Sequence, residues 1–97
     1  MKHMNITHPK PNLLLLYRKR MGFTQKRVAR LLGQRDSTML SRYERGRSQP
    51  PLDTALKLEI VLRVPVAFLY PQLHGELKRN IRQMEESSFV ARHTSHH

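Results

Sequence analysis

Four hydrogen-bonding side chains lie close together near the middle of this 97-residue chain: Ser37, Thr38, Ser41 and Arg42. On a helix, their spacing places them along one face. Arg42 has the most specific chemistry, because a guanidinium can donate two parallel hydrogen bonds to O6 and N7 of guanine. These residue types predict a helix that reads base edges in the major groove of double-stranded DNA. The alternative for Arg42 is a contact to a DNA phosphate only.

The charge of the surrounding sequence favours a polyanion as the ligand. The chain carries 18 Lys and Arg against 7 Asp and Glu, a net charge of +11. Residues 17–47 hold ten of the basic residues and two acidic ones, whereas residues 48–97 hold six and five. A basic surface confined to one part of a chain is typical of a nucleic-acid-binding protein. Charge alone leaves RNA and an anionic membrane surface open as alternatives.

Three arginines flank the base-reading candidates: Arg35, Arg45 and Arg47. They are candidates for contacts to DNA phosphates or for reaching into a narrow minor groove. The alternative for each is a solvated charge. Lys26 and Arg27 could add long-range attraction without touching DNA.

Two short helices joined by a turn are predicted to position these side chains. Thr24 is a typical N-cap residue and Gly33 can end a helix, so the first helix is expected at residues 25–32. The second begins near Asp36 or Ser37, either of which can cap it, and stops before the next glycine. This is the outline of a helix-turn-helix, a motif that places its second helix in the major groove of DNA.

Four further helices complete an all-α prediction. They are expected at residues 12–21, from Pro51 or Asp53 to about residue 62, at 66–70 and at 71–86. No segment alternates apolar and polar residues for long enough to form a strand. The residues assigned to the core are Leu31, Tyr43, Leu56 and Phe68.

The chain divides into a flexible lead-in (1–11), one domain (12–70), a C-terminal helix (71–86) and a flexible tail (87–97). The C-terminal helix carries an apolar stripe: Leu73, Leu77, Ile81 and Met84. This stripe predicts a homodimer contact. The basic residues and the glycine around it favour a weak or DNA-dependent dimer. The alternative is that the stripe folds back onto the domain's own core.

Several pieces of the sequence between Leu13 and Leu69 form a characteristic series: Arg18, Thr24-Gln25, Ala29, Gly33, Ser41-Arg42-Tyr43-Glu44-Arg45-Gly46, Pro50-Pro51-Leu52 and Val64 through Leu69. With them the chain resembles the Cro and lambda-repressor type of helix-turn-helix domain, the XRE-like family of prokaryotic and phage regulators. The resemblance implies a five-helix lambda-repressor-like DNA-binding domain, here followed by an additional C-terminal helix. One departure is that Gly33 to Glu44 is one residue longer than the family pattern. It leaves open whether Ser37 or Thr38 is the first to meet a base.

The resemblance also implies roles for three further residues. Gln25 would contact a DNA phosphate, at a helix N-terminus that itself favours an anion. Arg18 and Glu44 would form a structural pair, in which a bidentate Arg–carboxylate bond ties the first helix to the end of the third.

The residues and the resemblance together indicate a sequence-specific DNA-binding regulator of transcription. We expect a repressor that competes with or contacts RNA polymerase at a promoter. One alternative is an antitoxin, which represses its own operon and neutralises a toxin partner. A second is an RNA-binding or coactivator-bridging module. Proteins that read single-stranded RNA stack its bases on aromatic side chains. This chain has only three Phe and three Tyr, and Tyr43 and Phe68 are already assigned to the core, so the RNA alternative is disfavoured.

We expect no enzymatic activity, no cofactor and no metal site. No Ser-His-Asp or paired-carboxylate arrangement is readable. Cysteine is absent, and His93, His96 and His97 lack partners spaced for a metal. The longest apolar run, residues 13–16, is too short for a membrane span, and the first residues lack a signal-peptide core. The expected localisation is the cytoplasm, in association with the nucleoid.

Overall fold

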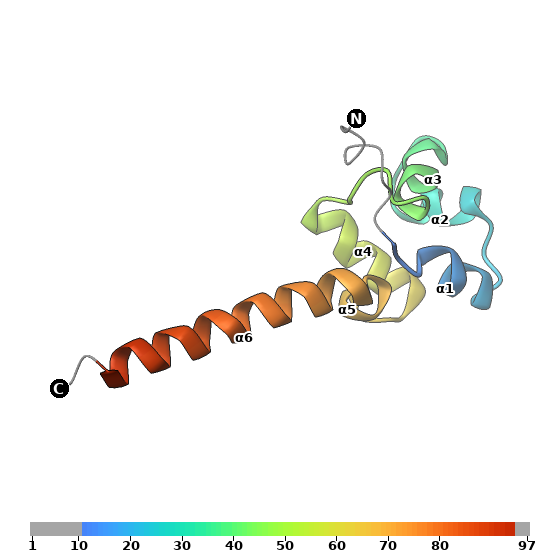
Figure 1. Cartoon of the computed structure of the whole chain (residues 1–97). Coiled ribbons are helices and arrows are strands. Elements are labelled where there is room, and N and C mark those ends of the chain that lie inside the picture. Colours follow the sequence, from blue (N-terminus) through green and yellow to red (C-terminus); the bar gives the residue numbers. More distant parts are fainter. Residues whose placement is uncertain (1–10, 95–97) are drawn as a thin grey trace, which may run out of the picture.

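The computed structural model describes residues 11–94, and the side chains of residues 11–88. Six helices occur in this part of the chain: α1 (Leu14–Arg20), α2 (Gln25–Leu31), α3 (Thr38–Glu44), α4 (Leu52–Leu62), α5 (Val66–Leu69) and α6 (Pro71–Thr94). Helices α1–α5 gather at one end of the molecule as a five-helix domain, while α6 runs away from them (Figure 1). The described residues contain no strand, and the expected all-α fold class is confirmed.

Polar side chains determine where α2 and α3 begin. The Thr24 hydroxyl accepts a hydrogen bond from the backbone N–H of Arg27 at 3.0 Å, which confirms the predicted N-cap. At the start of α3, the Asp36 carboxylate accepts the N–H of Thr38 at 2.9 Å. Ser37 occupies the N-cap position, but its side chain makes no capping hydrogen bond. Of the two candidates, Asp36 therefore supplies the capping side chain.

The core lies among the helices of the five-helix domain. Its buried residues are Leu14, Val28, Leu32, Leu40, Tyr43, Leu58, Leu62, Leu69 and Tyr70. Two hydrogen bonds fasten the start of α1 to this core. The N–H of Leu13 donates to the carbonyl of Leu69 at 2.8 Å, and the Asn12 side-chain amide donates to the carbonyl of Tyr43 at 2.9 Å. The two ends of the domain therefore meet beside α3.

Three of the four predicted core residues are wrong. Leu31 and Leu56 are each 46% exposed, and Phe68 is 59% exposed, whereas Tyr43 is buried as expected. A helix turns by about 100° per residue, so only one stripe of each helix can face the core. In α4 this stripe contains Leu58, and Leu56 two residues earlier lies on the other side. In α2 and α5 the next residue along the chain is the buried leucine instead.

Helix α6 is longer than predicted. It continues to Thr94 instead of ending near Glu86, so residues 87–94 of the predicted tail belong to the helix. No Gly or Pro follows the fifth residue of the helix, and nothing in this sequence breaks it. Residues 1–10 and 95–97 lie outside the described residues, and most of the predicted lead-in lies there with them.

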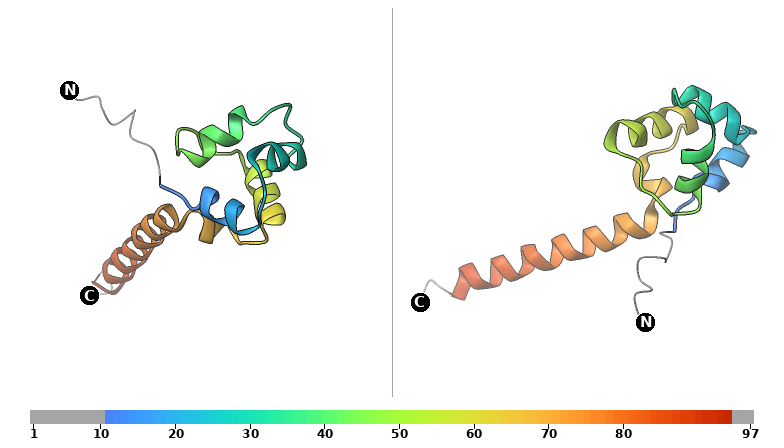
Figure 2. Two further views of the ribbon diagram at one scale, coloured as in Figure 1. Left: turned by 90° about the vertical axis from the view of Figure 1, so that its right-hand side faces the viewer. Right: turned by 90° about the horizontal axis from the view of Figure 1, so that it is seen from above.

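Helix α6 touches the five-helix domain only at its beginning. Leu73 is half-buried and packs against the core, and the N–H of His74 donates to the carbonyl of Tyr70 at 2.9 Å. From Leu77 to Ser88, every side chain is exposed. Two further views agree that α6 leaves the domain and does not return to it (Figure 2).

Candidate nucleic-acid interface

Helices α2 and α3 pack against each other across the turn that joins them. Val28 and Ala29 of α2 are buried, as are Leu40 and Tyr43 of α3. The small side chain of Ala29 allows the two helices to approach closely. Because the buried residues of α3 form one stripe, the opposite stripe faces solvent and is free to meet a ligand.

The outward stripe of α3 contains the two most exposed base-reading candidates. Thr38 and Arg42 are exposed and lie on the side of the helix opposite Leu40. Ser37 and Ser41 are half-buried at the edges of this face. Exposure therefore favours Thr38 over Ser37 as the first residue of α3 to reach a base.

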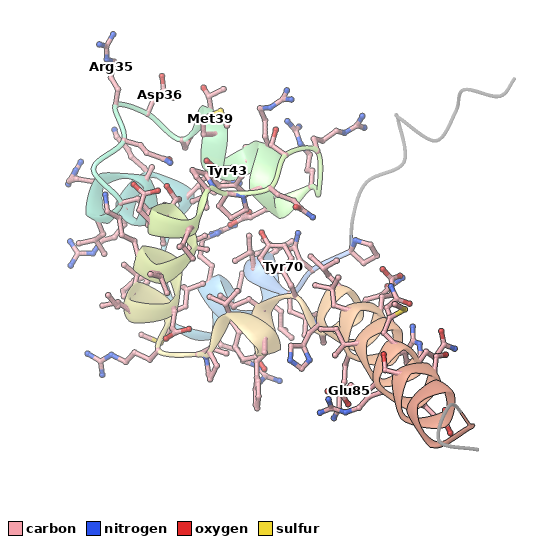
Figure 3. The ribbon with its side chains drawn as sticks, turned by 90° about the vertical axis from the view of Figure 1, so that its left-hand side faces the viewer. Arg35, Asp36, Met39, Tyr43, Tyr70 and Glu85 are labelled. Atoms are coloured by element: carbon pink, nitrogen blue, oxygen red, sulfur yellow. The ribbon has the colours of Figure 1, made fainter. Side chains whose placement is uncertain are left out.

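Arg42 is held by one edge of its guanidinium. Its Nε donates to the hydroxyl of Ser48 at 3.1 Å, which links α3 to the connector before α4. The two Nη atoms carry four further N–H donors, so the bond to Ser48 is compatible with bidentate donation to a base. Met39 is 40% exposed and lies near Asp36 at the same end of α3 (Figure 3).

Exposed arginines surround α3 at both of its ends. Arg35 lies in the turn before the helix and points away from the ribbon (Figure 3). Arg45 and Arg47 follow the helix, and all three side chains are exposed. Long cationic side chains at these places can reach the two phosphate strands that border a groove.

Arg30 is a candidate that the sequence analysis missed. It lines one surface hollow together with Lys26 and Arg35, where α2 meets the turn before α3. Lys26 and Arg30 are four residues apart and therefore share a face of α2. This spacing was the available signal, but only the fold brings Arg35 next to the pair.

A buried ion pair joins α1 to the end of α3. Arg18 donates from Nε to Oε2 of Glu44 at 2.5 Å and from Nη2 to Oε1 at 3.2 Å. Its Nη1 donates to the carbonyl of Phe23 at 2.9 Å. The Arg18 and Glu44 side chains are only 11% and 4% exposed. The structure thus brings together the two residues of the expected structural pair, in the bidentate geometry.

Gln25 also belongs to this buried arrangement. Its side-chain Nε2 donates to Oε1 of Glu44 at 2.8 Å, and the residue is half-buried at the start of α2. One carboxylate therefore holds α1, α2 and α3 together and orients the outward face of α3. A phosphate contact by Gln25 stays a prediction.

Among the described side chains, two titratable groups have shifted pKa values. The backbone N–H of Thr38, followed by its side chain, donates to Asp36 and lowers the pKa of that carboxyl. Burial raises the pKa of Tyr70 to about 12, with a smaller contribution from the phenol of Tyr43. Asp36 is therefore an anion and Tyr70 is neutral at neutral pH. Neither pKa is shifted toward neutral pH, where a general acid or base would be most effective.

The four candidate dimer residues separate into two groups. Leu73 packs against the core of its own chain, which agrees with the alternative prediction that the stripe folds back onto the domain. Leu77, Ile81 and Met84 are 51%, 54% and 68% exposed. Of the four candidates, these three form an exposed apolar stripe on α6.

The described residues show neither a metal site nor a membrane span. Among the described residues, no group of three His, Cys, Asp or Glu side chains could hold a metal ion. His96, His97 and the side chain of His93 lie outside what the structure describes. No described helix combines the length and the apolar character that a membrane span requires.

The chain is similar to one protein family and to solved structures of other proteins. The profile of a Helix-turn-helix family matches residues 14–69. The chain is similar to a hypothetical transcription factor, NHTF, from Neisseria, with 32% identity, a TM-score of 0.51, and coverage of 66% of this chain and 75% of that one. It is also similar in fold to the clp gene regulator ClgR from Corynebacterium glutamicum, with 21% identity, a TM-score of 0.56, and coverage of 84% and 94%. No curated protein matches.

Proposed function

Because the chain belongs to the XRE-type helix-turn-helix family of DNA-binding transcription regulators, we propose that it is a repressor that binds a specific double-stranded DNA site. In this proposal, α3 lies in the major groove and reads base edges with Thr38 and Arg42, with Ser37 and Ser41 at the edges of the contact. Bound at a promoter, the protein excludes RNA polymerase, and no chemical step is required. Its place of action is the DNA of the nucleoid in the cytoplasm.

The outward face of α3 is the observation that supports this proposal. Thr38 and Arg42 are exposed there, while Leu40 and Tyr43 anchor the opposite face in the core. A helix held in this way presents its polar side chains rigidly, and rigidity is what base discrimination requires. The exposed Arg35, Arg45 and Arg47 would anchor the phosphates on either side, and the hollow lined by Lys26 and Arg30 would add to them.

Two copies on one DNA site are part of the proposal. A single small domain buries little DNA surface, so a tight site is expected to have two halves. An antitoxin would need a surface for a toxin in addition to the DNA contacts. The exposed stripe of α6 is open to either partner, a toxin or a second copy of this chain.

Selection of bound duplexes from a random DNA pool tests the proposal most directly. We expect one enriched sequence with two similar halves. The affinity for that duplex should fall with salt at a log–log slope of about −5 to −7, because about six to eight phosphates are contacted. Single-stranded RNA of equal length serves as the competitor. No enriched duplex, a slope near zero, or preferential binding of the RNA would each contradict the proposal.

A further inference from the structure

The exposed part of α6 needs a partner. The helix has 24 residues and is about 36 Å long, and beyond its first turn no described side chain is buried. Most of the stability of a helix in a protein comes from packing of its apolar face and not from the helix alone. Its stable form therefore depends on packing that the five-helix domain does not provide.

One face of α6 has the pattern of a helix–helix contact. His74, Leu77, Ile81 and Met84 follow each other at spacings of three, four and three residues. This is the heptad spacing of helices that pair along their length. Leu77 and Ile81 line a shallow surface hollow together with His74, Lys78 and Arg82. The hollow can receive an apolar side chain of another helix.

Two opposite charges border this face on one side. Lys78 and Glu85 are seven residues apart, directly after Leu77 and Met84, so they occupy equivalent places in successive heptads. Both side chains are exposed, and Glu85 lies on α6 well away from the five-helix domain (Figure 3). Glu85 also forms an exposed ion pair with Arg82 at 3.3 Å, which is weak and can be exchanged.

The positions of these two charges indicate which helix pairs with α6 and in which direction it runs. We propose that α6 pairs with α6 of a second copy in antiparallel orientation, with Ile81 of each chain against Met84 of the other. In this register Lys78 of each chain lies beside Glu85 of the other, and the two-fold symmetry forms this pair twice. The proposal rests on the proposed function in one respect, because it supplies the second copy that a two-part DNA site requires.

The neighbouring arrangements are electrostatically worse. Sliding one antiparallel helix by a heptad places Lys78 against Lys78, or Glu85 against Glu85 in the other direction. In a parallel pair, identical residues lie at the same level, so Lys78 and Glu85 are separated by about 10 Å along the axis. Like charges directly opposite each other destabilise the slid registers, whereas the parallel pair leaves Lys78 and Glu85 without a charged partner. Among these arrangements, only the proposed register pairs the two opposite charges. The contact is short, so the free dimer should be weak and strengthened on DNA.

Charge reversal in the full chain tests the pairing. Lys78→Glu and Glu85→Lys should each weaken self-association about tenfold in sedimentation equilibrium, because two ion pairs become two repulsions. The double variant should recover the original affinity. A mixture of the two single variants should form a mixed dimer in preference to either homodimer. Circular dichroism of each variant verifies that the helices are retained.

Matched controls lie on the opposite face of α6. Arg79→Glu and Glu86→Lys make the same changes of charge, also seven residues apart, at exposed positions that point away from the apolar stripe. They should leave self-association unchanged. Equal weakening by the two sets of variants, or no recovery in the double variant, would overturn the proposed pairing.

Cross-linking determines the direction, since the natural chain has no cysteine. An Ile81→Cys variant mixed with a Met84→Cys variant should give a mixed disulfide on oxidation, because these positions face each other in the antiparallel pair. Leu77→Cys should form no disulfide with itself, whereas a parallel pair would join it readily. A monomer at all concentrations, with and without the selected duplex, would also overturn the proposal. The function would survive that result if the monomer still bound a half-site duplex with the expected salt dependence.

Discussion

The five-helix domain and α6 use leucine in different ways. Leu14, Leu40, Leu58 and Leu69 are at most 1% exposed and come from four different helices of the domain. Of the described side chains of α6, only Leu73 packs against this core, and Leu77 is half exposed. The domain therefore holds its own shape, whereas the outer part of α6 has no packing within its own chain, and the proposed pairing with a second copy would supply it. A helix that reads DNA must belong to a domain that holds its own shape, because its side chains must be placed accurately before DNA arrives.

Two ion pairs show the same contrast. Arg18 and Glu44 join different helices and are almost completely buried, whereas Arg82 and Glu85 lie on one helix with each side chain 62% exposed. A buried charge left without its partner is strongly unfavourable, but exposed pairs contribute little, because water solvates each charge separately.

The largest expected effect comes from breaking the buried pair. Glu44→Ala should lower the free energy of unfolding by about 3–5 kcal/mol, since it leaves Arg18 buried without a carboxylate. Urea unfolding measures the loss. Glu85→Ala is the matched control and should change stability by about 0.5 kcal/mol or less. Similar losses in the two variants would mean that the buried and the exposed ion pair contribute equally to the free energy of unfolding.

The DNA contacts should divide the arginines of the two regions by role. Arg42→Ala should weaken binding to the preferred duplex by about 1–3 kcal/mol and relax the preference at one base pair. Arg47→Ala should weaken binding to all duplexes about equally. Arg79→Ala removes the same charge from α6 and should have the smallest effect. Fluorescence titrations on matched and mismatched duplexes measure all three, and identical behaviour of Arg42→Ala and Arg47→Ala would refute the division.

Replacing glycine by alanine should change stability in opposite directions in the two regions. Gly33 ends α2 with φ of +80°, a conformation that strains any L side chain, so Gly33→Ala should destabilise the domain by about 1 kcal/mol or more. Gly75 lies inside α6, and an added Cβ would only meet the end of the flexible Arg79 side chain at 3.6 Å. Gly75→Ala should therefore stabilise α6 by about 0.5–1 kcal/mol. Circular dichroism melts of both variants measure the two effects, and the same sign in both would contradict the comparison.

The smallest effect concerns the carboxylate that caps α3. Asp36 has a lowered pKa in the folded chain, so its contribution to stability is fully present above its ordinary pKa of 3.8. This contribution is lost as the pH falls below that value toward the folded pKa. The stability difference between the natural chain and Asp36→Ala should therefore shrink in acid. Urea midpoints at neutral and acidic pH measure it, and a difference that does not depend on pH would exclude the capping carboxylate as its source.

Much of the fold could be predicted because local signals agree with it. The N-cap at Thr24, the helix-ending Gly33 and the turn before α3 follow from backbone chemistry that acts over a few residues. The burial of particular leucines could not be predicted in this way. Leu31 and Leu32 are equally apolar neighbours, and only the packing of α2 within the domain decides that Leu32 is buried.

The sequence by itself determined the helical fold, the basic segment around α3 and the residue types available to contact DNA. These properties depend on composition and short-range spacing, and they do not depend on how the helices pack against one another. The tertiary structure alone decided which side of each helix is buried, that Gln25 joins Arg18 at the carboxylate of Glu44, and that Arg30 and Arg35 line one hollow. It also decided that α6 continues away from the domain. Contacts between residues far apart in the sequence depend on how helices cross, and that geometry is an outcome of packing the whole core at once.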